Sequence, residues 1–591
     1  MAVKIATSID LFAMYRSMHN YYVDKTGFIE DLLAQGERVF LFTRPRRFGK
    51  TLLMSMLAEF FDITKDSRNL FAGLKVSANE VLCKEWMNEY PVIFLSLKDV
   101  EGKNFAEALD ILNNKIVNLF NPHEGILATD KIWTGDRRAF EEIINRRATK
   151  GILRDSLGIL TSVLNKYYQK RVIVLIDEYD APVTRADTYG YYDEMIAFMR
   201  GFLSSALKSN PNLNFGIVTG CLRIAKESLF SEFNNPRCYD ISSTEYADMF
   251  GFTQAEVDKL LQDAALSGKR DEIKKWYDGY CFGKNQEIYC PWSIMNYVAD
   301  AQKDPEASPL AYWLNSGKND LVRKFVARHV PEMADDIAVL LAGGCVVRKI
   351  ETELSHESLE LWQDSIWSLL YLAGYLTKAS EAQMLQSGAR PKAALDEMAL
   401  VIPNQEVRKV FAKDYVVWFQ SIAKRLEDRI DTALWEGDAE KLVQLLESIL
   451  LKNISSRDLA SRRHGKQSKN KNKGATEDTR KSAPYENFYH AFLTGFLLSR
   501  YPDTLSNREI GKGFFDIRVI DDQRAFVMEV KRTDNEKEDL AALAKKGLDQ
   551  IEERRYNVDL ADNPDITTVL HWSVAFCRKS CAARAIFVKR P

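Results

Sequence analysis

The chain has 591 residues, which is too long for one hydrophobic core and favours roughly three to five domains. Hydrophobic residues make up 46% of it and charged residues 28%, values typical of a soluble globular protein. The formal net charge of −2 excludes a polycation, so any contact with nucleic acid must come from local basic patches.

The eight cysteines are scattered and form no CxxC pair, and the seven histidines show no zinc-binding spacing. Reduced thiols in a cytoplasmic protein are therefore expected. The first residues lack the apolar core of a signal peptide, and no apolar run approaches the roughly 20 residues that a membrane-spanning helix needs. We expect a cytoplasmic protein with no membrane partner.

Short apolar segments alternate with helical patterns through the first part of the chain. Strands that alternate with helices predict a parallel α/β sheet, and from about residue 250 to 450 the pattern becomes mainly helical. The predicted strands are Val39–Thr43, Pro91–Leu97, Arg171–Ile176 and Asn214–Thr219, and the helices between them include Thr51–Phe61, Phe105–Asn121 and Tyr192–Leu207.

The stretch from residue 43 to 51, Thr-Arg-Pro-Arg-Arg-Phe-Gly-Lys-Thr, follows the first predicted strand and opens a helix. A phosphate-binding loop has the pattern Gly, four residues, then Gly-Lys-Ser/Thr, and here Arg44 stands at the first Gly position. Backbone N–H groups at the helix start cradle phosphates, while the lysine reaches the β- and γ-phosphates and the hydroxyl ligates Mg²⁺. An ordinary basic helix N-terminus is the alternative. The predicted nucleotide-binding residues are Arg46, Arg47, Phe48, Gly49, Lys50 and Thr51.

A second motif supports the nucleotide site. The apolar run from residue 172 to 176 ends in Asp177 and Glu178. Asp177 would hold the Mg²⁺ shell and Glu178 would orient or deprotonate the attacking water, whereas a strand-end turn is the alternative. Thr219, at the end of the fourth strand, is a candidate sensor of the γ-phosphate, and Arg223 is a candidate charge-stabilising arginine. An ordinary loop role is the alternative for both.

Residues 455–483 break the folded pattern, because they are rich in Lys, Arg, Ser, Asn and Gly and almost free of large apolar groups. From Arg457 to Lys481, nine Lys or Arg face three Asp or Glu, a difference of six positive charges. This composition predicts a flexible linker or inserted loop. A basic arm that contacts phosphates is the functional interpretation, and a solvated tether is the simpler one.

Two short apolar segments near the C-terminus, 514–520 and 525–531, flank a polar stretch. If Asp522 and Gln523 form a two-residue hairpin loop, Asp516 stands opposite Glu529 with Cβ atoms roughly 4.5–5.5 Å apart. Two carboxylates at such a short distance repel each other unless a cation lies between them. Oxygen ligands of this kind suit Mg²⁺. Lys531 falls on the same side by strand alternation. This pattern predicts a metal-dependent nuclease centre, and a surface hairpin with scattered charge is the alternative.

With these motifs, the chain resembles a bacterial family of AAA-ATPase-like proteins that carry a C-terminal PD-(D/E)XK nuclease domain. In that family, a phosphate-binding loop without the first glycine is usual. The matching segments are Tyr22–Ile29, Arg44–Thr51, Leu175–Pro182, Trp276–Tyr280, Pro291–Ser293, Ile402–Asn404, Glu406–Val407, Tyr485–His490, Ser506–Gly511, Asp516, Glu529–Lys531 and Gln550–Ile551.

The resemblance implies further site residues. Glu486 would be the helix carboxylate that completes the metal site with Asp516 and Glu529, and Gln550 would be the helix glutamine that accompanies such centres. Gln550 also lies near the apolar face of its predicted helix, where a satisfied core amide is the alternative. Family members usually carry an arginine after the residue that corresponds to Gly513, whereas this chain has Phe514.

We therefore expect an α/β fold with an AAA-like P-loop ATPase domain at 1–250, a helical lid or adaptor with a winged-helix element as an option at 251–454, and a restriction-endonuclease-like α/β domain at 484–591. The expected cofactors are ATP and Mg²⁺, with Mn²⁺ as an alternative, and the expected partner is nucleic acid, DNA before RNA. An ATP-switched binding protein with an inactive nuclease fold is the rival interpretation. The resemblance implies a role in defence against foreign DNA, or a mobile element as the setting. It leaves open whether Arg223 acts within its chain or across a homo-oligomer interface.

Overall fold

The computed structural model divides into two compact units, which are described separately. The first contains Met1–Val322, Val347–Ser380 and Pro391–Glu406, and the second contains Arg323–Val346, Glu381–Arg390 and Val407–Pro591. The predicted linker 455–483 and Arg223 lie outside the described residues. The structure describes residues 3–222, 236–313, 343–352, 364–392, 396–419, 423–453, 486–501, 503–510, 513–533, 537–556, 565–578 and 580–588, together with some single residues that lie between these ranges. Within them, no helix combines the length and apolar character that crossing a bilayer requires.

A five-stranded parallel sheet with the order β2-β3-β4-β1-β5 forms the centre of the first unit. The predicted parallel α/β sheet is confirmed, and β5 is a strand that the sequence pattern did not predict. Because parallel strands end at the same edge of a sheet, β1, β3 and β4 bring their C-terminal residues together. The strands are β1 (Val39–Thr43), β2 (Val92–Ser96), β3 (Val172–Asp177), β4 (Leu213–Gly220) and β5 (Arg237–Tyr239).

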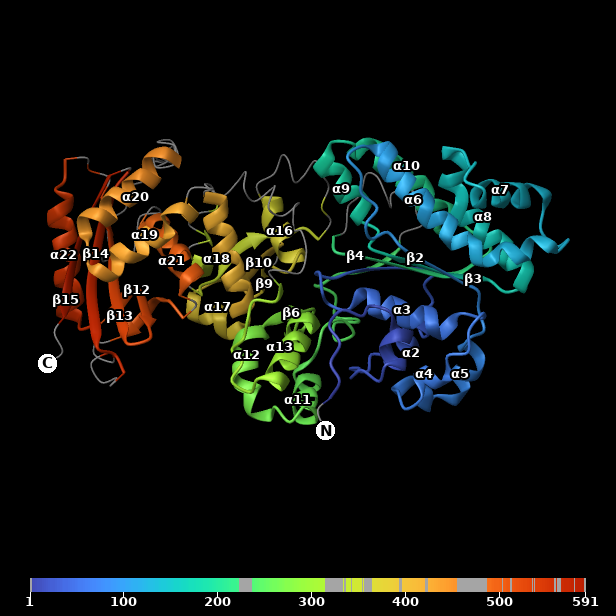
Figure 1. Ribbon diagram of the computed structural model, residues 1–591, viewed down its shortest axis with the longest axis horizontal. Coiled ribbons are helices and arrows are strands. Elements are labelled where there is room, and N and C mark those ends of the chain that lie inside the picture. Colours follow the sequence, from blue (N-terminus) through green and yellow to red (C-terminus); the bar gives the residue numbers. More distant parts are fainter. Residues whose placement is uncertain are drawn as a thin grey trace, which may run out of the picture. The chain divides into compact units, whose positions relative to one another are not determined.

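Helices cover both faces of this sheet, so the unit has three layers (Figure 1). Alternate strand residues point to opposite layers: Val172, Val174 and Ile176 pack with the helices of one face, and Ile173 and Leu175 pack with those of the other. The first face carries α6 (Phe105–Phe120), α7 (Thr134–Ile144), α8 (Lys150–Tyr168), α9 (Ala181–Tyr189) and α10 (Tyr192–Leu207). The second carries α1 (Phe12–Ser17), α2 (Gly27–Leu33), α3 (Lys50–Phe61), α4 (Arg68–Phe71) and α5 (Glu80–Trp86).

The rest of the first unit is not purely helical, because two small sheets accompany its helices. The first helix of this region begins with a capping box, in which the Thr253 hydroxyl and the Glu256 carboxylate satisfy each other's backbone N–H groups. Its elements are α11 (Gln254–Asp263), α12 (Arg270–Tyr277), β6 (Tyr280–Phe282), β7 (Asn285–Ile288), α13 (Pro291–Lys303), β8 (Val346–Lys349), α16 (Asp364–Leu372), β9 (Thr377–Lys378) and β10 (Glu397–Val401).

The motif Trp276–Tyr280 packs against the motif Ile402–Asn404. Gly279 has a φ of +119°, and a Cβ at this position would lie 2.0 Å from the carbonyl oxygen of Pro403. Only glycine therefore fits this close approach. The Asn404 side-chain amide donates a hydrogen bond of 3.2 Å to the Tyr277 carbonyl. The two motifs thus form one structural joint.

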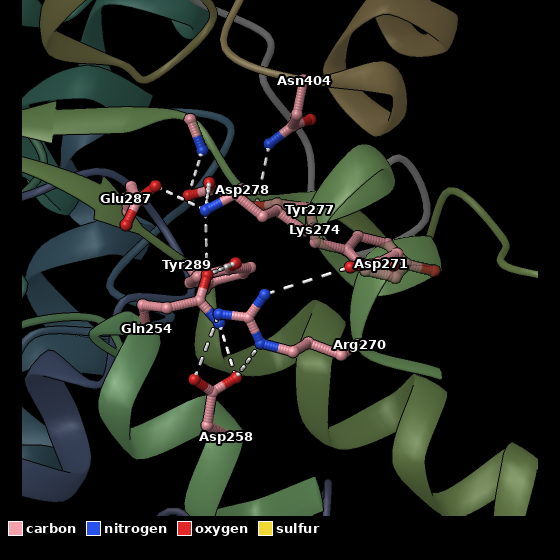
Figure 2. Close-up of polar contacts among 11 residues, drawn as sticks. Gln254, Asp258, Arg270, Asp271, Lys274, Tyr277, Asp278, Glu287, Tyr289 and Asn404 are labelled. Carbon is pink, nitrogen blue, oxygen red and sulfur yellow. Dashed lines mark hydrogen bonds and ion pairs between the residues drawn. The ribbon is translucent and has the colours of Figure 1, made fainter. Parts of the chain in front are cut away.

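Lys274 lies at the centre of a polar cluster beside this joint (Figure 2). Its ammonium donates to Gln254 Oε1 at 3.2 Å, forms an ion pair with Asp278 at 3.5 Å and contacts the carboxylate of Glu287. These partners come from α11, from the end of α12 and from β7, so one cation ties together three segments. We assign this cluster to structure, because every group in it that the figure labels contacts another protein group.

Glu406 is a buried carboxylate that joins the motif Pro291–Ser293 to the chain around residue 313. It accepts hydrogen bonds from the Ser293 hydroxyl at 2.7 Å and from the backbone N–H of Trp313 at 2.8 Å. Burial raises the pKa of Glu406 from 4.5 to about 7, and the hydrogen bonds only partly oppose this rise. The family motifs of this region therefore gather around packing contacts.

The raised pKa of Glu406 predicts that stability falls as pH rises. Between pH 4.5 and about 7 the unfolded chain releases this proton while the folded chain keeps it, so a stabilising contribution present at low pH is lost. The loss is on the order of 3 kcal/mol at most. Melting curves of wild type and Glu406→Gln from pH 5 to 8 measure it. The variant should lack this part of the pH slope, and parallel slopes would contradict the prediction.

The second unit has a five-stranded sheet with the order β11-β12-β13-β14-β15, in which β13 and β14 are parallel and the other neighbours are antiparallel. Helices α19, α20 and α21 cover one face of this sheet, and α22 covers the other face (Figure 1). The strands are β11 (Leu505–Ile510), β12 (Gly513–Asp521), β13 (Arg524–Arg532), β14 (Thr568–Cys577) and β15 (Ser580–Val588). The helices are α17 (Glu381–Ser387), α18 (Gln405–Phe419), α19 (Ala423–Glu436), α20 (Ala439–Asn453), α21 (Glu486–Arg500) and α22 (Leu540–Arg554).

The hairpin of β12 and β13 has the register that the sequence predicts. The pairs run from Asp521 opposite Arg524 to Ile517 opposite Met528, so Asp522 and Gln523 form a two-residue loop. Asp522 has a φ of +50°, the left-handed conformation that such tight loops require. The paired residues end at Ile517 opposite Met528, so Asp516 and Glu529 each lie directly beside the last pair.

Candidate functional site

The first candidate site lies where β1, β3 and β4 end. Gly49 caps α3 with a φ of +83°, and Arg47 has a φ of +69°, so two left-handed residues shape the loop. The loop lines a cavity of about 670 Å³, a size that suits a small-molecule ligand. All six predicted loop residues from Arg46 to Thr51 line it. The Phe48 ring is buried against Tyr280 and Phe282, so this side chain anchors the loop.

Arg44, which replaces the first glycine of the motif, points away from this cavity. Its guanidinium is fully buried and donates to the carbonyl oxygens of Thr43 and Tyr239 at 2.9 and 2.8 Å. It also stacks on the rings of Phe250 and Phe282. Burial lowers its pKa to about 10. Arg44 therefore stabilises the base of the loop and has a structural role.

Three predicted residues meet at the carboxyl edge of the sheet. The Thr51 hydroxyl donates to one carboxylate oxygen of Asp177 at 2.7 Å, and the Thr219 hydroxyl donates to the other at 2.5 Å. The Lys50 ammonium donates to the carbonyl oxygens of Arg44 and Pro45, both at 2.9 Å. A hydroxyl and a carboxylate in contact are the donors that Mg²⁺ takes beside a nucleotide. These residues fit a divalent cation beside a bound phosphate, and Thr51 and Asp177 are the groups that would hold it.

Glu178 lines the cavity next to this group. Its backbone is left-handed, with a φ of +54°, which is uncommon for a residue other than glycine and turns the side chain out of the strand direction. Burial raises its pKa, and the neighbouring charge of Asp177 raises it further, while Lys50 lowers it. A carboxyl group with a raised pKa beside a phosphate loop is suited to accept a proton from water.

Tyr179 and Asp180, the two residues that follow Glu178, also belong to this site, although the sequence did not predict them as parts of it. Asp180 accepts hydrogen bonds from the backbone N–H groups of Cys221 and Leu222 at 2.9 and 3.0 Å. The Tyr179 hydroxyl donates to the Leu222 carbonyl at 2.7 Å. Together they fix the segment that follows Thr219. The signal was the Tyr-Asp pair directly after the two acids, but its partners come from the segment that follows β4.

The second candidate site lies on the β12–β13 hairpin beneath α22. The Lys531 ammonium donates to Glu529 Oε1 at 2.8 Å and to Gln550 Oε1 at 2.7 Å. The Gln550 amide also contacts Glu529 Oε1. Asp516 Oδ2 accepts a hydrogen bond of 2.7 Å from the backbone N–H of Val530. The structure thus brings four predicted residues, Asp516, Glu529, Lys531 and Gln550, to one place.

Glu529 is only 2% exposed, and its Oε2 atom has no hydrogen-bond partner among the described residues. Burial raises its pKa to about 7, the charge of Asp516 raises it too, and Lys531 lowers it. A buried carboxylate oxygen that lacks a partner and stands near a second acid fits a divalent cation. Within the described side chains no three His, Cys, Asp or Glu groups form a metal shell. Glu486 is the first residue of α21, but its side chain is outside the described set.

Gly547 on α22 is a site residue that the sequence reasoning missed. A Cβ here would lie 2.1 Å from Ser573 Oγ, 3.0 Å from Ser573 Cβ and 3.4 Å from Lys531 Cγ. The glycine therefore lets the helix approach the sheet closely enough for Gln550 to reach both Glu529 and Lys531. Such a contact is invisible in sequence, because β14 supplies Ser573.

Gly547→Ala should push α22 away from the sheet. We expect a loss of about 1–3 kcal/mol in stability, typical of overpacking, and weaker binding of a divalent cation because Gln550 moves from its partners. Thermal unfolding and calorimetric titration with Mn²⁺ measure these effects. Ser573→Ala in the same chain should restore part of both, because Ser573 Oγ has no partner among the described residues. A double variant as impaired as the single one would contradict this explanation.

Comparison with known proteins gives family matches over the two parts of the chain that contain these sites. Residues 6–230 match the family model described as "Predicted AAA-ATPase", and residues 484–585 match that of the PD-(D/E)XK nuclease superfamily. The chain is also 28% identical over 413 residues to a protein of Azotobacter chroococcum mcd 1 described as "Uncharacterized protein in vnfD 5'region". That match covers 68% of each chain.

Proposed function

We propose that this chain, which joins an AAA-ATPase-like domain to a C-terminal domain of the PD-(D/E)XK nuclease superfamily, hydrolyses ATP and cleaves phosphodiester bonds of DNA in a Mg²⁺-dependent reaction. The observation that carries the proposal is the meeting of Asp516, Glu529, Lys531 and Gln550 beneath α22. A role in defence against foreign DNA is part of the proposal and rests on family resemblance alone.

In the proposed nuclease reaction Asp516 and Glu529 would hold the divalent cation, and the resemblance implies Glu486 as the third carboxylate. When bound, the cation would polarise the scissile phosphate and lower the pKa of a water. Lys531 offsets the negative charge that develops on the phosphate. Gln550 keeps the Lys531 ammonium and the Glu529 carboxylate in place, so that neither must reorganise during the reaction.

In the proposed ATPase reaction the loop from Arg46 to Thr51 binds the phosphates. Lys50 would exchange its contacts with the loop carbonyls for the β- and γ-phosphates, and Thr219 would sense the γ-phosphate through its contact with Asp177. Glu178 would take the proton of the attacking water. Nucleotide would gate the nuclease, which requires that ATP bind one conformation better than the other.

Cleavage of plasmid DNA by the full chain tests the proposal. Wild type and Asp516→Ala are compared in Mg²⁺, in Mn²⁺ and in EDTA, and a matched RNA is offered in parallel. Cleavage by wild type in the two metals, absent in EDTA and in the variant, supports the nuclease assignment. Equal behaviour of the two proteins would reject it, and preferential cleavage of RNA would correct the substrate.

A nuclease fold that binds nucleic acid without cutting it is the second candidate. The exposed Phe514, 57% accessible, favours it, because the resemblance implies an arginine there. This candidate predicts that wild type binds DNA and has ATPase activity but leaves the DNA intact in both metals.

A further inference from the structure

We propose that Arg554, on the last turn of α22, binds a backbone phosphate of the nucleic acid at the second site. The proposal rests on the proposed nuclease function and adds a substrate-binding residue to it. Arg554 lies outside the family motifs described above, and it is brought to the site by the fold.

The side chain of Arg554 is held by contacts on two sides. Its guanidinium donates a hydrogen bond of 3.1 Å to the hydroxyl of Tyr556, a side chain with no exposed surface. Its aliphatic part packs against Gly513, since a Cβ at that glycine would lie 3.0 Å from Arg554 Cδ. An anchored side chain loses less conformational freedom when it binds a ligand than a mobile one does.

The anchor of Arg554 is connected to the catalytic group. The Tyr556 hydroxyl also accepts a hydrogen bond of 3.3 Å from Gln550, which contacts Glu529 and Lys531. The charges of Arg554 and Glu529 interact, because each favours the ionised form of the other. Arg554 therefore lies at the rim of the site, within the electrostatic reach of the proposed metal ligands.

The charges of the site explain why a second cationic group is useful. Asp516 and Glu529 repel a phosphate, and the Lys531 ammonium is already shared between Glu529 and Gln550. Within the described residues the Arg554 guanidinium makes one hydrogen bond, so its other N–H groups can form a forked contact with phosphate oxygens. This geometry suits a sequence-independent contact with the sugar-phosphate backbone.

Binding of a fluorescent DNA duplex by the full chain in EDTA, over a range of KCl concentrations, tests the proposal. Arg554→Gln should weaken binding on the order of tenfold and lower the slope of log K against log salt by about one. Arg554→Lys keeps the charge and should retain that slope. Arg555→Gln is the matched control, because it removes the same charge one residue further along, and it should behave as wild type.

Cleavage in Mg²⁺ gives the second measurement, in which Arg554→Gln should raise KM more than it lowers kcat. Melting temperatures check that the variants remain folded. If wild type binds DNA and Arg554→Gln behaves like Arg555→Gln, the Arg554 assignment is overturned while the nuclease proposal stands. If wild type neither binds nor cleaves nucleic acid, both proposals are overturned. An equal effect of Arg554→Lys and Arg554→Gln on the salt slope would also overturn the phosphate contact.

Discussion

Replacing Glu529 by Gln should reduce metal-dependent cleavage by a factor on the order of 10²–10³ or more, as expected when a charged group that stabilises the transition state is lost. The amide has nearly the same shape, so it can still contact Lys531 and Gln550. It cannot offer the negative oxygen that a divalent cation needs. Calorimetric titration with Mn²⁺ should show the loss of the tight site directly, apart from any assay of cleavage.

A matched control separates this effect from a general change in charge. Glu553→Gln makes the same substitution at an exposed position of α22 and should leave both metal binding and cleavage unchanged. The stability of Glu529→Gln should be equal to or higher than that of wild type, because burial already disfavours the ionised carboxylate. Full cleavage by Glu529→Gln would refute the metal site.

The hairpin and its acids could be predicted from sequence because the information is local. A two-residue loop fixes the register of an antiparallel pair, and the register fixes which side chains oppose each other. These two rules predicted that Asp516 and Glu529 lie close together, and the observed register ends at the neighbouring pair, Ile517 and Met528. The apolar face of the helix that carries Gln550 likewise indicated how that helix would lie, since Leu548 and Ile551 are buried in the observed core.

Residues whose role depends on contacts from distant segments could not be predicted in this way. Arg44 stands where the motif has its first glycine, but only the fold shows that its guanidinium binds the carbonyl of Tyr239 on the neighbouring strand β5. Gly547 was an ordinary helix residue until β14 placed Ser573 beneath it. The helices α19 and α20 pack on the sheet of the second unit, although they precede the C-terminal motifs by many residues. Such pairings arise from tertiary packing, which single-sequence periodicity does not contain.

Replacing Glu178 by Gln should reduce ATP turnover by a factor on the order of 10²–10⁴, the usual contribution of a positioned general base. ATP binding should survive, because the loop from Arg46 to Thr51 and Asp177 are untouched. Phosphate release and binding of a fluorescent ATP analogue measure the two properties separately. Glu194→Gln, an exposed substitution of the same type on α10, is the matched control. Loss of binding in Glu178→Gln would mean that Glu178 shapes the pocket and does not serve as the base.

The same variant tests whether the two sites communicate, since it should hold ATP without consuming it. If ATP binds one conformation of the chain better than the other, Glu178→Gln saturated with ATP represents that conformation alone. Its rate of DNA cleavage with ATP should then differ from its rate without nucleotide. Lys50→Met, which should lose ATP binding, must show no such difference. Equal rates with and without ATP in Glu178→Gln would mean that the nuclease acts independently of the nucleotide, because no difference in affinity would remain to drive a change.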